Sequence, residues 1–186
     1  MSDLQKWQIV GSRMVLDNRW CKVRRDAVKL PDGTIIDDYF VNIRPEIVLV
    51  VPVTVDRRLV FVRQYRHGVG EILLEFPAGA MDAGEDNIIE AARREFEEET
   101  GYESGELIPI ATLYDNPVKD TNRIHIFLAP NATPTGKQHL DITEEIEIIL
   151  IPLAEIREKI RAREITVSGS LAALYLALDF LHDRGF

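Results

Sequence analysis

Cysteine, long apolar runs and excess positive charge are all scarce in this sequence of 186 residues. The one cysteine, Cys21, excludes an intrachain disulfide and indicates a cytoplasmic protein. No apolar stretch approaches the roughly 20 residues of a membrane span, so we expect no membrane association. The formal net charge of −9 argues against a nucleic-acid partner, because binding to nucleic acid requires a basic surface.

The length suits one domain with a sizeable core and a small N-terminal extension. In the main domain, residues 45–186, strands and helices mix without regular βαβ alternation. We therefore predict an α+β fold, in which helices sandwich a mixed sheet. The expected strands are 47–55, 59–64, 72–76, 106–113, 124–129 and 146–151, a loop is expected at 77–84, and the expected helices are 87–100, 153–162 and 168–181.

The N-terminal segment, residues 1–44, is predicted to be a small antiparallel sheet of short strands. Pro31-Asp32-Gly33 is a turn signal between two of these strands. A piece this small is not stable alone. We therefore expect it to pack against the main domain or against a second copy of the chain.

The predicted helix at 87–100 carries an unusual set of acids. At about 100° per residue, its apolar side chains form one stripe: Ile88, Ile89, Ala92 and Phe96. Three polar positions lie well off the stripe and should be solvated: Glu90, Arg93 and Glu97. Glu99 falls inside the stripe, Glu95 at its edge and Glu98 further round on the same side, so the three carboxylates should be neighbours.

These three carboxylates are unfavourable where they stand. Like charges four residues apart repel, acids near a helix C-terminus oppose the helix dipole, and carboxylates beside apolar surface are poorly hydrated. A divalent cation would relieve all three effects. Because the cluster offers only oxygen ligands, Mg²⁺ or Mn²⁺ suits it better than Zn²⁺. A solvated acidic face is the alternative interpretation.

Residues 79–102 resemble the Nudix box, which reads Gly, five residues, Glu, seven residues, then Arg-Glu-hydrophobic-x-Glu-Glu-x-Gly-hydrophobic. Gly79 and Glu85 have the first spacing, and the run from Arg94 to Tyr102, including Gly101, matches the second half in full. Eight residues rather than seven separate Glu85 from Arg94. We expect the extra residue in the loop before the helix, which leaves the helical carboxylates in register.

The resemblance covers most of the chain from about Trp20 and is strongest to the ADP-ribose and nucleoside-diphosphate-sugar pyrophosphatase branch. Three segments carry it: 63–66 (Arg-Gln-Tyr-Arg), 74–79 (Leu-Glu-Phe-Pro-Ala-Gly) and 123–129 (Arg-Ile-His-Ile-Phe-Leu-Ala). Pro117, fifteen residues after Tyr102, is similar to a proline that marks ADP-ribose hydrolases. The resemblance implies an α/β/α sandwich and an N-terminal extension that helps to form a homodimer.

The resemblance also implies roles for individual residues. Two or three Mg²⁺ or Mn²⁺ ions per site would be held by Glu95, Glu98, Glu99 and the carbonyl of Ala78, with Arg94 orienting the site. The catalytic carboxylate would come from a late loop, where Glu144 is favoured over Glu145. Residues predicted to contact substrate are Arg66, Arg44 and Glu75 near the diphosphate, and Trp20 and Tyr39 at the base.

The predicted activity is hydrolysis of ADP-ribose, or of a related nucleoside diphosphate sugar, to a nucleoside monophosphate and a sugar phosphate. One alternative is a non-catalytic nucleotide-sugar sensor, although such relatives often lose box carboxylates that this chain retains. Another is a Nudix hydrolase acting on other nucleotides. An isoprenoid diphosphate isomerase would need an active-site cysteine, and Cys21 lies in the N-terminal extension.

Overall fold

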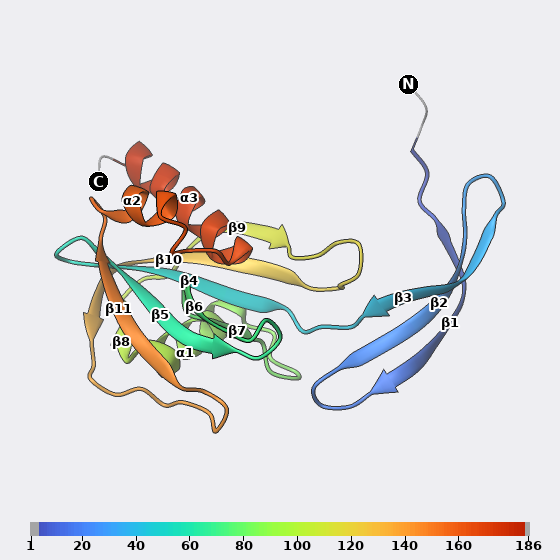
Figure 1. Ribbon diagram of the computed structural model, residues 1–186, viewed down its shortest axis with the longest axis horizontal. Helices are drawn as coiled ribbons and strands as arrows, with labels where there is room; N and C mark the ends of the chain where they lie inside the picture. The colour runs from blue at the N-terminus through green and yellow to red at the C-terminus, as the bar shows by residue number, and fades with distance from the viewer. Residues whose placement is uncertain (1–3, 185–186) are drawn as a thin grey trace. The chain divides into compact units, whose positions relative to one another are not determined.

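The computed structural model describes residues 4–184 (Figure 1). Residues 1–3 and 185–186, which the predicted domain ranges include, lie outside it. The chain divides into two compact units. The first contains the residues up to Pro45 together with Tyr114–Asn122, and the second contains Glu46–Leu113 together with the residues from Arg123 onward.

The first unit is built on an antiparallel sheet in the order β1-β2-β3. Its strands are β1 (Gln8–Asp17), β2 (Lys22–Lys29) and β3 (Ile35–Asn42). The predicted turn joins β2 to β3, with Gly33 at φ 91°, a conformation that favours glycine. Asp26 and Val28 are the buried positions of this sheet, whereas every residue of β1 is exposed. The sheet therefore buries little apolar surface of its own.

The second unit contains an eight-stranded sheet with the central order β11-β5-β4-β10-β8. β6 pairs with β5, β7 with β4, and β9 with β10. β4 runs parallel to β10 but antiparallel to β5, so the sheet is mixed, as predicted. Its strands are β4 (Ile47–Thr54), β5 (Arg58–Arg66), β6 (Glu71–Glu75), β7 (Ala78–Ala80), β8 (Tyr102–Glu103), β9 (Ile108–Tyr114), β10 (Arg123–Pro134) and β11 (Ile146–Pro152).

Helices cover both faces of this sheet, because alternate side chains of β4 point to opposite faces. Val48 and Val50 pack with the buried face of α1 (Ile88–Thr100). Leu49, Val51 and Val53 pack with α3 (Ser168–Asp183) and with Ile156 of α2 (Ile156–Arg161). The predicted sandwich of a mixed sheet between helices is confirmed, and Figure 1 shows its layers.

The main differences from the sequence prediction are local. The predicted loop at 77–84 contains β7, whose short Ala-Gly-Ala sequence carries no strand pattern but pairs with β4. β10 continues to Pro134, beyond the apolar run that identified it. The helix expected from residue 153 begins at Ile156, after a turn. Within residues 4–184, no helix is both long and apolar enough to cross a membrane.

Candidate active site

Helix α1 begins and ends close to the predicted positions because both ends are capped. Asn87 is the N-cap, and its side-chain oxygen accepts hydrogen bonds from the N–H groups of Ile89 and Glu90. Gly101 ends the helix at φ 62° and donates its N–H to the carbonyl of Glu97. The backbone of Lys137 would lie 2.9 Å from a Cβ at residue 101, so this position also lacks room for a side chain.

The buried face of α1 is rotated from the predicted stripe. Ile89 is 43% exposed, so its assignment to the core was wrong, while Ala91 is fully buried. The helix packs on the sheet through two alanines and Phe96. The predicted stripe was drawn mainly through the larger apolar residues and therefore missed Ala91. Two positions expected to be solvated, Arg93 and Glu97, are half-buried, and Arg93 donates to the carbonyl of Ser104 at 2.9 Å.

Glu99 is buried, as its position inside the apolar stripe predicted, with 3% of its surface exposed. Its carboxylate accepts a hydrogen bond of 2.9 Å from the N–H of Ala78 on β7. Burial, reinforced by the nearby charges of Glu95 and Glu144, raises the pKa of Glu99 to about 8. The folded chain therefore holds a carboxylate that is strongly destabilised as an anion unless a cation binds it.

Glu95 lies directly over Gly79 of β7. A Cβ added at Gly79 would stand 2.0 Å and 2.5 Å from the two carboxylate oxygens of Glu95, far inside contact distance. Burial, together with the charges of Glu98 and Glu144, raises the pKa of Glu95, although Arg94 opposes this shift. The absence of a side chain at Gly79 is therefore what gives the Glu95 carboxylate its position.

Arg94 connects the carboxylates of the box. Its Nη1 donates to Glu95 at 2.7 Å and to Glu98 at 3.3 Å, and its Nη2 donates to Glu85 at 3.2 Å. Burial opposes the charge of Arg94, but the hydrogen bonds and charges of Glu95 and Glu85 raise its pKa. Glu85 also accepts the N–H of Asp82 at 3.0 Å. Glu85, in the loop before α1, therefore reaches Arg94 despite the longer spacing between the two residues.

Arg66 and Glu75 form a second ion pair, between the ends of β5 and β6. The Nε and Nη2 of Arg66 donate to the two carboxylate oxygens of Glu75 at 2.8 Å and 3.2 Å. Burial opposes the charge of Arg66, but Glu75, with the charges of Glu99 and Glu144, raises its pKa. The N–H of the next residue, Phe76, donates to Ser170 of α3 at 3.0 Å. Sequence reasoning missed Ser170, because nothing in the sequence connects it to residue 76.

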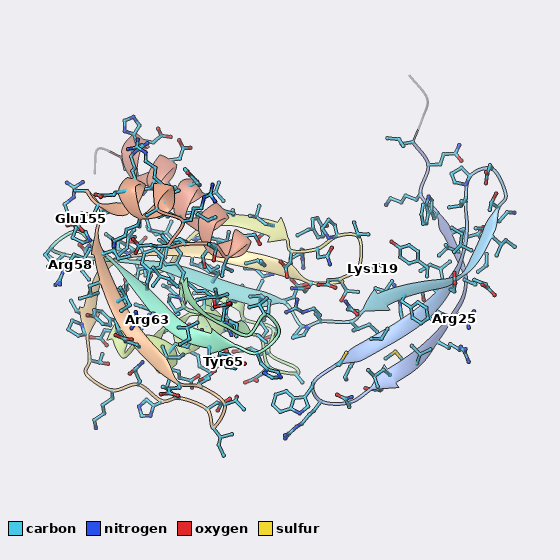
Figure 2. All side chains as sticks on the ribbon, viewed as in Figure 1. Arg25, Arg58, Arg63, Tyr65, Lys119 and Glu155 are labelled. Carbon is cyan, nitrogen blue, oxygen red and sulfur yellow. The ribbon has the colours of Figure 1, made fainter. Side chains whose placement is uncertain are left out.

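The two candidate carboxylates of the loop before β11, Glu144 and Glu145, lie in different surroundings. Glu144 is half-buried and accepts the N–H of Asp141 at 2.9 Å. Its charge raises the pKa of both Glu95 and Glu99. Glu145 is exposed and lines a separate groove with residues of β5 that include Arg63 and Tyr65, both labelled in Figure 2. The charge of Glu144 therefore acts on the carboxylates of α1, whereas Glu145 lines the separate groove.

The carbonyl of Ala78 is available on the edge of β7 that faces α1. In an antiparallel pair, the N–H and C=O of one residue point to the same side. The N–H of Ala78 points to Glu99, whereas the preceding carbonyl, of Pro77, accepts the N–H of Val50 on β4. The carbonyl of Ala78 therefore points away from β4, toward the same side as Glu99.

The donor set fits a hard divalent cation, since it combines carboxylates with a backbone carbonyl. Among residues 4–184, no three acidic, histidine or cysteine side chains are gathered in a metal-binding geometry. The carboxylates of Glu95 and Glu98 are turned to Arg94, and that of Glu99 to Ala78. A cation bound by these carboxylates would therefore have to replace these hydrogen bonds.

The remaining predicted substrate residues belong to the first unit. Arg44 lies 3.3 Å from the carboxylates of both Asp115 and Asp120. The hydroxyl of Tyr39 donates to the carbonyl of Val118 at 2.7 Å, and its ring is edge-on to the ring of Trp7. Trp20 is 73% exposed, with the guanidinium of Arg19 over its ring at 4.4 Å. Pro117 lies in the loop that contains Val118.

A comparison with protein-family models decides the family of the chain. Residues 44–168 match the model of the NUDIX domain. The chain belongs to the Nudix family. Residues 7–42 match a second model, that of the nucleoside diphosphate sugar hydrolase N-terminal domain. The Nudix match contains every carboxylate of the cluster described above, and the predicted resemblance is confirmed.

Curated proteins and a solved structure are similar to most of the chain. It is 32% identical to the ADP-ribose pyrophosphatase of Bacillus subtilis over 82% of this chain and 83% of that protein. It is 29% identical to the methanol dehydrogenase activator of Bacillus methanolicus, over 96% and 97% of the two chains. A crystal structure of an ADP compounds hydrolase matches with a TM-score of 0.87 and 27% identity, over 100% of this chain and 99% of the other. The chain is therefore a Nudix hydrolase.

Proposed function

We propose that this Nudix hydrolase cleaves the diphosphate linkage of ADP-ribose, or of a related nucleoside diphosphate sugar. The products would be a nucleoside monophosphate and a sugar phosphate. The observation that carries the proposal is the buried carboxylate of Glu99, held beside Glu95 and Glu144 and close to the Arg66–Glu75 ion pair. The names of the ADP-ribose pyrophosphatase and the ADP compounds hydrolase indicate the same substrate class.

Glu95, Glu98, Glu99 and the carbonyl of Ala78 would hold Mg²⁺ or Mn²⁺. When bound, such ions neutralise charge on the diphosphate and lower the pKa of a bound water. The role of the chain is to keep the carboxylates together at a site where water hydrates them poorly. Arg94 supports this role, because its contacts with Glu85, Glu95 and Glu98 offset the mutual repulsion of the acids.

Glu144 is the proposed residue that orients or deprotonates the attacking water. Its nearness to Glu95 and Glu99 supports this role, and the separate groove of Glu145 favours Glu144 of the two. Arg66 is the proposed phosphate ligand. An arginine has five N–H donors, and Glu75 uses two of those of Arg66. The remaining donors suit the planar, charge-assisted contacts that phosphate groups accept.

We also propose that the chain forms a homodimer through its first unit. In this unit, Trp20 and Tyr39 are the proposed contacts of the base, and Arg44 is a proposed contact of phosphate. β1 exposes several apolar side chains, including Ile9, Val10, Met14, Val15 and Leu16. A second copy of the chain would bury this strand. Light scattering after gel filtration should give twice the chain mass, and the Met14→Lys, Leu16→Lys double variant should give the monomer mass. A monomeric parent protein would refute the dimer.

The activity is tested by incubating the purified chain with ADP-ribose and Mg²⁺ and measuring AMP. Replacing Glu98 or Glu99 by Gln should reduce kcat by roughly 10²-fold or more, because each change removes a charged ligand. Glu97→Gln is the matched control, since Glu97 shares the helix but its side chain forms no hydrogen bond or ion pair within residues 4–184. Tight binding of ADP-ribose without turnover would favour a sensor. No cleavage of any nucleoside diphosphate sugar with either metal would refute the proposal.

A further inference from the structure

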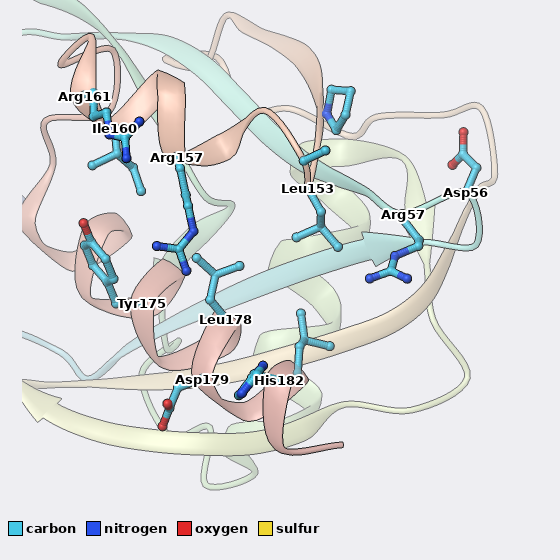
Figure 3. Close-up of a pocket in the computed structure, with 13 residues that line it drawn as sticks. Asp56, Arg57, Leu153, Arg157, Ile160, Arg161, Tyr175, Leu178, Asp179 and His182 are labelled. Carbon is cyan, nitrogen blue, oxygen red and sulfur yellow. The ribbon is translucent and has the colours of Figure 1, made fainter. Parts of the chain in front are cut away.

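A pocket of about 820 Å³ lies on the face of the sheet opposite α1. Residues of α2, α3, the β4–β5 turn and the link from β11 to α2 line it (Figure 3). The volume is within the range of sites that enclose small organic molecules. The carboxylate cluster faces the other side of the sheet, so this pocket is not part of the proposed catalytic site.

Three arginines line the pocket: Arg57, Arg157 and Arg161. Within residues 4–184, none of the three makes an ion pair or a side-chain hydrogen bond. The chain carries a net charge of −9, and most arginines of the sheet, such as Arg58 and Arg63, pair with carboxylates. Three unpaired guanidinium groups around one pocket are therefore an uncommon concentration of available positive charge in this protein.

Two acids, Asp56 and Asp179, also line the pocket. Asp56 is already paired, since it lies 2.7 Å from Arg58 and accepts the hydroxyl hydrogen of Thr54. Asp179 on α3 is therefore the one remaining carboxylate that balances the charge of three guanidinium groups in this pocket. The pocket consequently retains an excess of positive charge, which favours an anionic ligand.

Arg57 is the last residue of the three-residue turn between β4 and β5, where hairpins commonly place a left-handed residue. Its φ is 62°, in the left-handed region that arginine rarely adopts. Its N–H donates to the carbonyl of Thr54, and its carbonyl accepts the N–H of Leu153. These bonds tie the turn to the link before α2. Arg57 lines the pocket from this turn and Arg157 from α2 (Figure 3).

The walls between these charges are apolar. Leu153 and Ile160 come from the α2 segment, and Leu178 comes from α3; all three are partly buried against the core. Tyr175 is 56% exposed and offers one aromatic ring at the edge of the pocket. A ligand that satisfies both the guanidinium groups and these walls has an anionic head and a flat or apolar body.

We infer that this pocket binds a phosphate-bearing organic anion of about nucleotide size, at a site separate from the catalytic carboxylates. Arg157 and Arg161, with Arg57 at the turn, would hold the phosphate through charge-assisted hydrogen bonds. Leu153, Leu178 and the ring of Tyr175 would cover the organic body.

Isothermal titration calorimetry with AMP, in EDTA without divalent metal, tests this inference. The Arg66→Gln variant serves as the parent, because it weakens phosphate binding at the catalytic site. Adding Arg157→Gln and Arg161→Gln to this parent should weaken AMP binding by at least roughly tenfold, the loss expected when charged hydrogen bonds are removed. Arg163→Gln, which removes the same charge just beyond α2 but does not line the pocket, is the control and should bind as the parent does.

Titrations with adenosine and with inorganic pyrophosphate test the contributions of the organic body and of the phosphate separately. The inference predicts that AMP binds more tightly than either, since each lacks the phosphate or the organic body. It is overturned if the Arg66→Gln parent binds no AMP, if the arginine pair can be replaced without loss, or if pyrophosphate binds as tightly as AMP. Melting temperatures of all variants confirm folding. Because metal and turnover are absent, the result is independent of the proposed hydrolase activity.

Discussion

Gly79→Ala should inactivate the site while leaving the fold intact. The added methyl group would stand 2.0 Å from the nearer oxygen of Glu95, and real Cβ atoms essentially never approach closer than 3.0 Å. The carboxylate must therefore retreat by about 1 Å, which also disturbs its 2.7 Å hydrogen bond to Arg94. Misplacement of a catalytic group by about 1 Å costs on the order of 10²-fold in rate, or about 2.7 kcal/mol.

The stability of the variant should change by less than about 1 kcal/mol. Residue 79 does not have a positive φ, so alanine can adopt its backbone conformation. A glycine-to-alanine change at such a position stabilises a protein by about 0.4–1 kcal/mol through the unfolded state, which offsets part of the strain at Glu95. The atoms that the new Cβ meets belong to the end of a flexible side chain, so the helix itself need not move.

The assay compares kcat/KM for ADP-ribose and the Mg²⁺ concentration for half-maximal rate, with melting temperature measured in parallel. Gly105→Ala is the matched control, because its Cβ meets no atom within 4 Å. The Gly79→Ala, Glu95→Gln double variant should have a kcat/KM no lower than that of Glu95→Gln alone, because Gly79→Ala acts through the Glu95 carboxylate. Wild-type activity and Mg²⁺ dependence in Gly79→Ala would refute the reasoning, because Glu95 would then work from another position.

Three further predictions concern metal binding and stability. Addition of Mg²⁺ should raise the melting temperature of the parent protein by several degrees but change that of Glu99→Gln much less, because ligand binding to the native state stabilises it; equal shifts would show that Glu99 is not a ligand. The pKa of Glu46 is lowered, since the hydrogen bonds from Arg123 and His125 outweigh the opposing effect of burial. Its stabilising contribution is present above about pH 4.5 and is lost as the pH falls through the lowered pKa. Glu46→Gln should therefore lower the free energy of unfolding in urea at pH 7, by up to about 1 kcal/mol, and the difference should shrink progressively as the pH falls below 4.5. Ser170→Ala removes the acceptor of the buried N–H of Phe76 and should lower the free energy of unfolding by about 1–3 kcal/mol; chemical denaturation with no change in midpoint would contradict this.

Helix α1 shows what local sequence determines. Its boundaries follow from Asn87 and Gly101, and the i, i+3, i+4 spacing of Glu95, Glu98 and Glu99 places these residues at neighbouring positions of one helix face. These properties depend on residues within a few turns of each other. The family match and the buried state of Glu99 were both accessible from this pattern.

Contacts between distant segments were decided only by the tertiary structure. Gly79 lies under Glu95 because β7 pairs with β4, and an Ala-Gly-Ala strand has no pattern of its own. The different surroundings of Glu144 and Glu145 depend on how their loop approaches α1, which the sequence does not describe. The arginine pocket joins the β4–β5 turn to two helices about a hundred residues later. Side-chain periodicity is a short-range property of the chain, whereas these sites depend on which elements pack together.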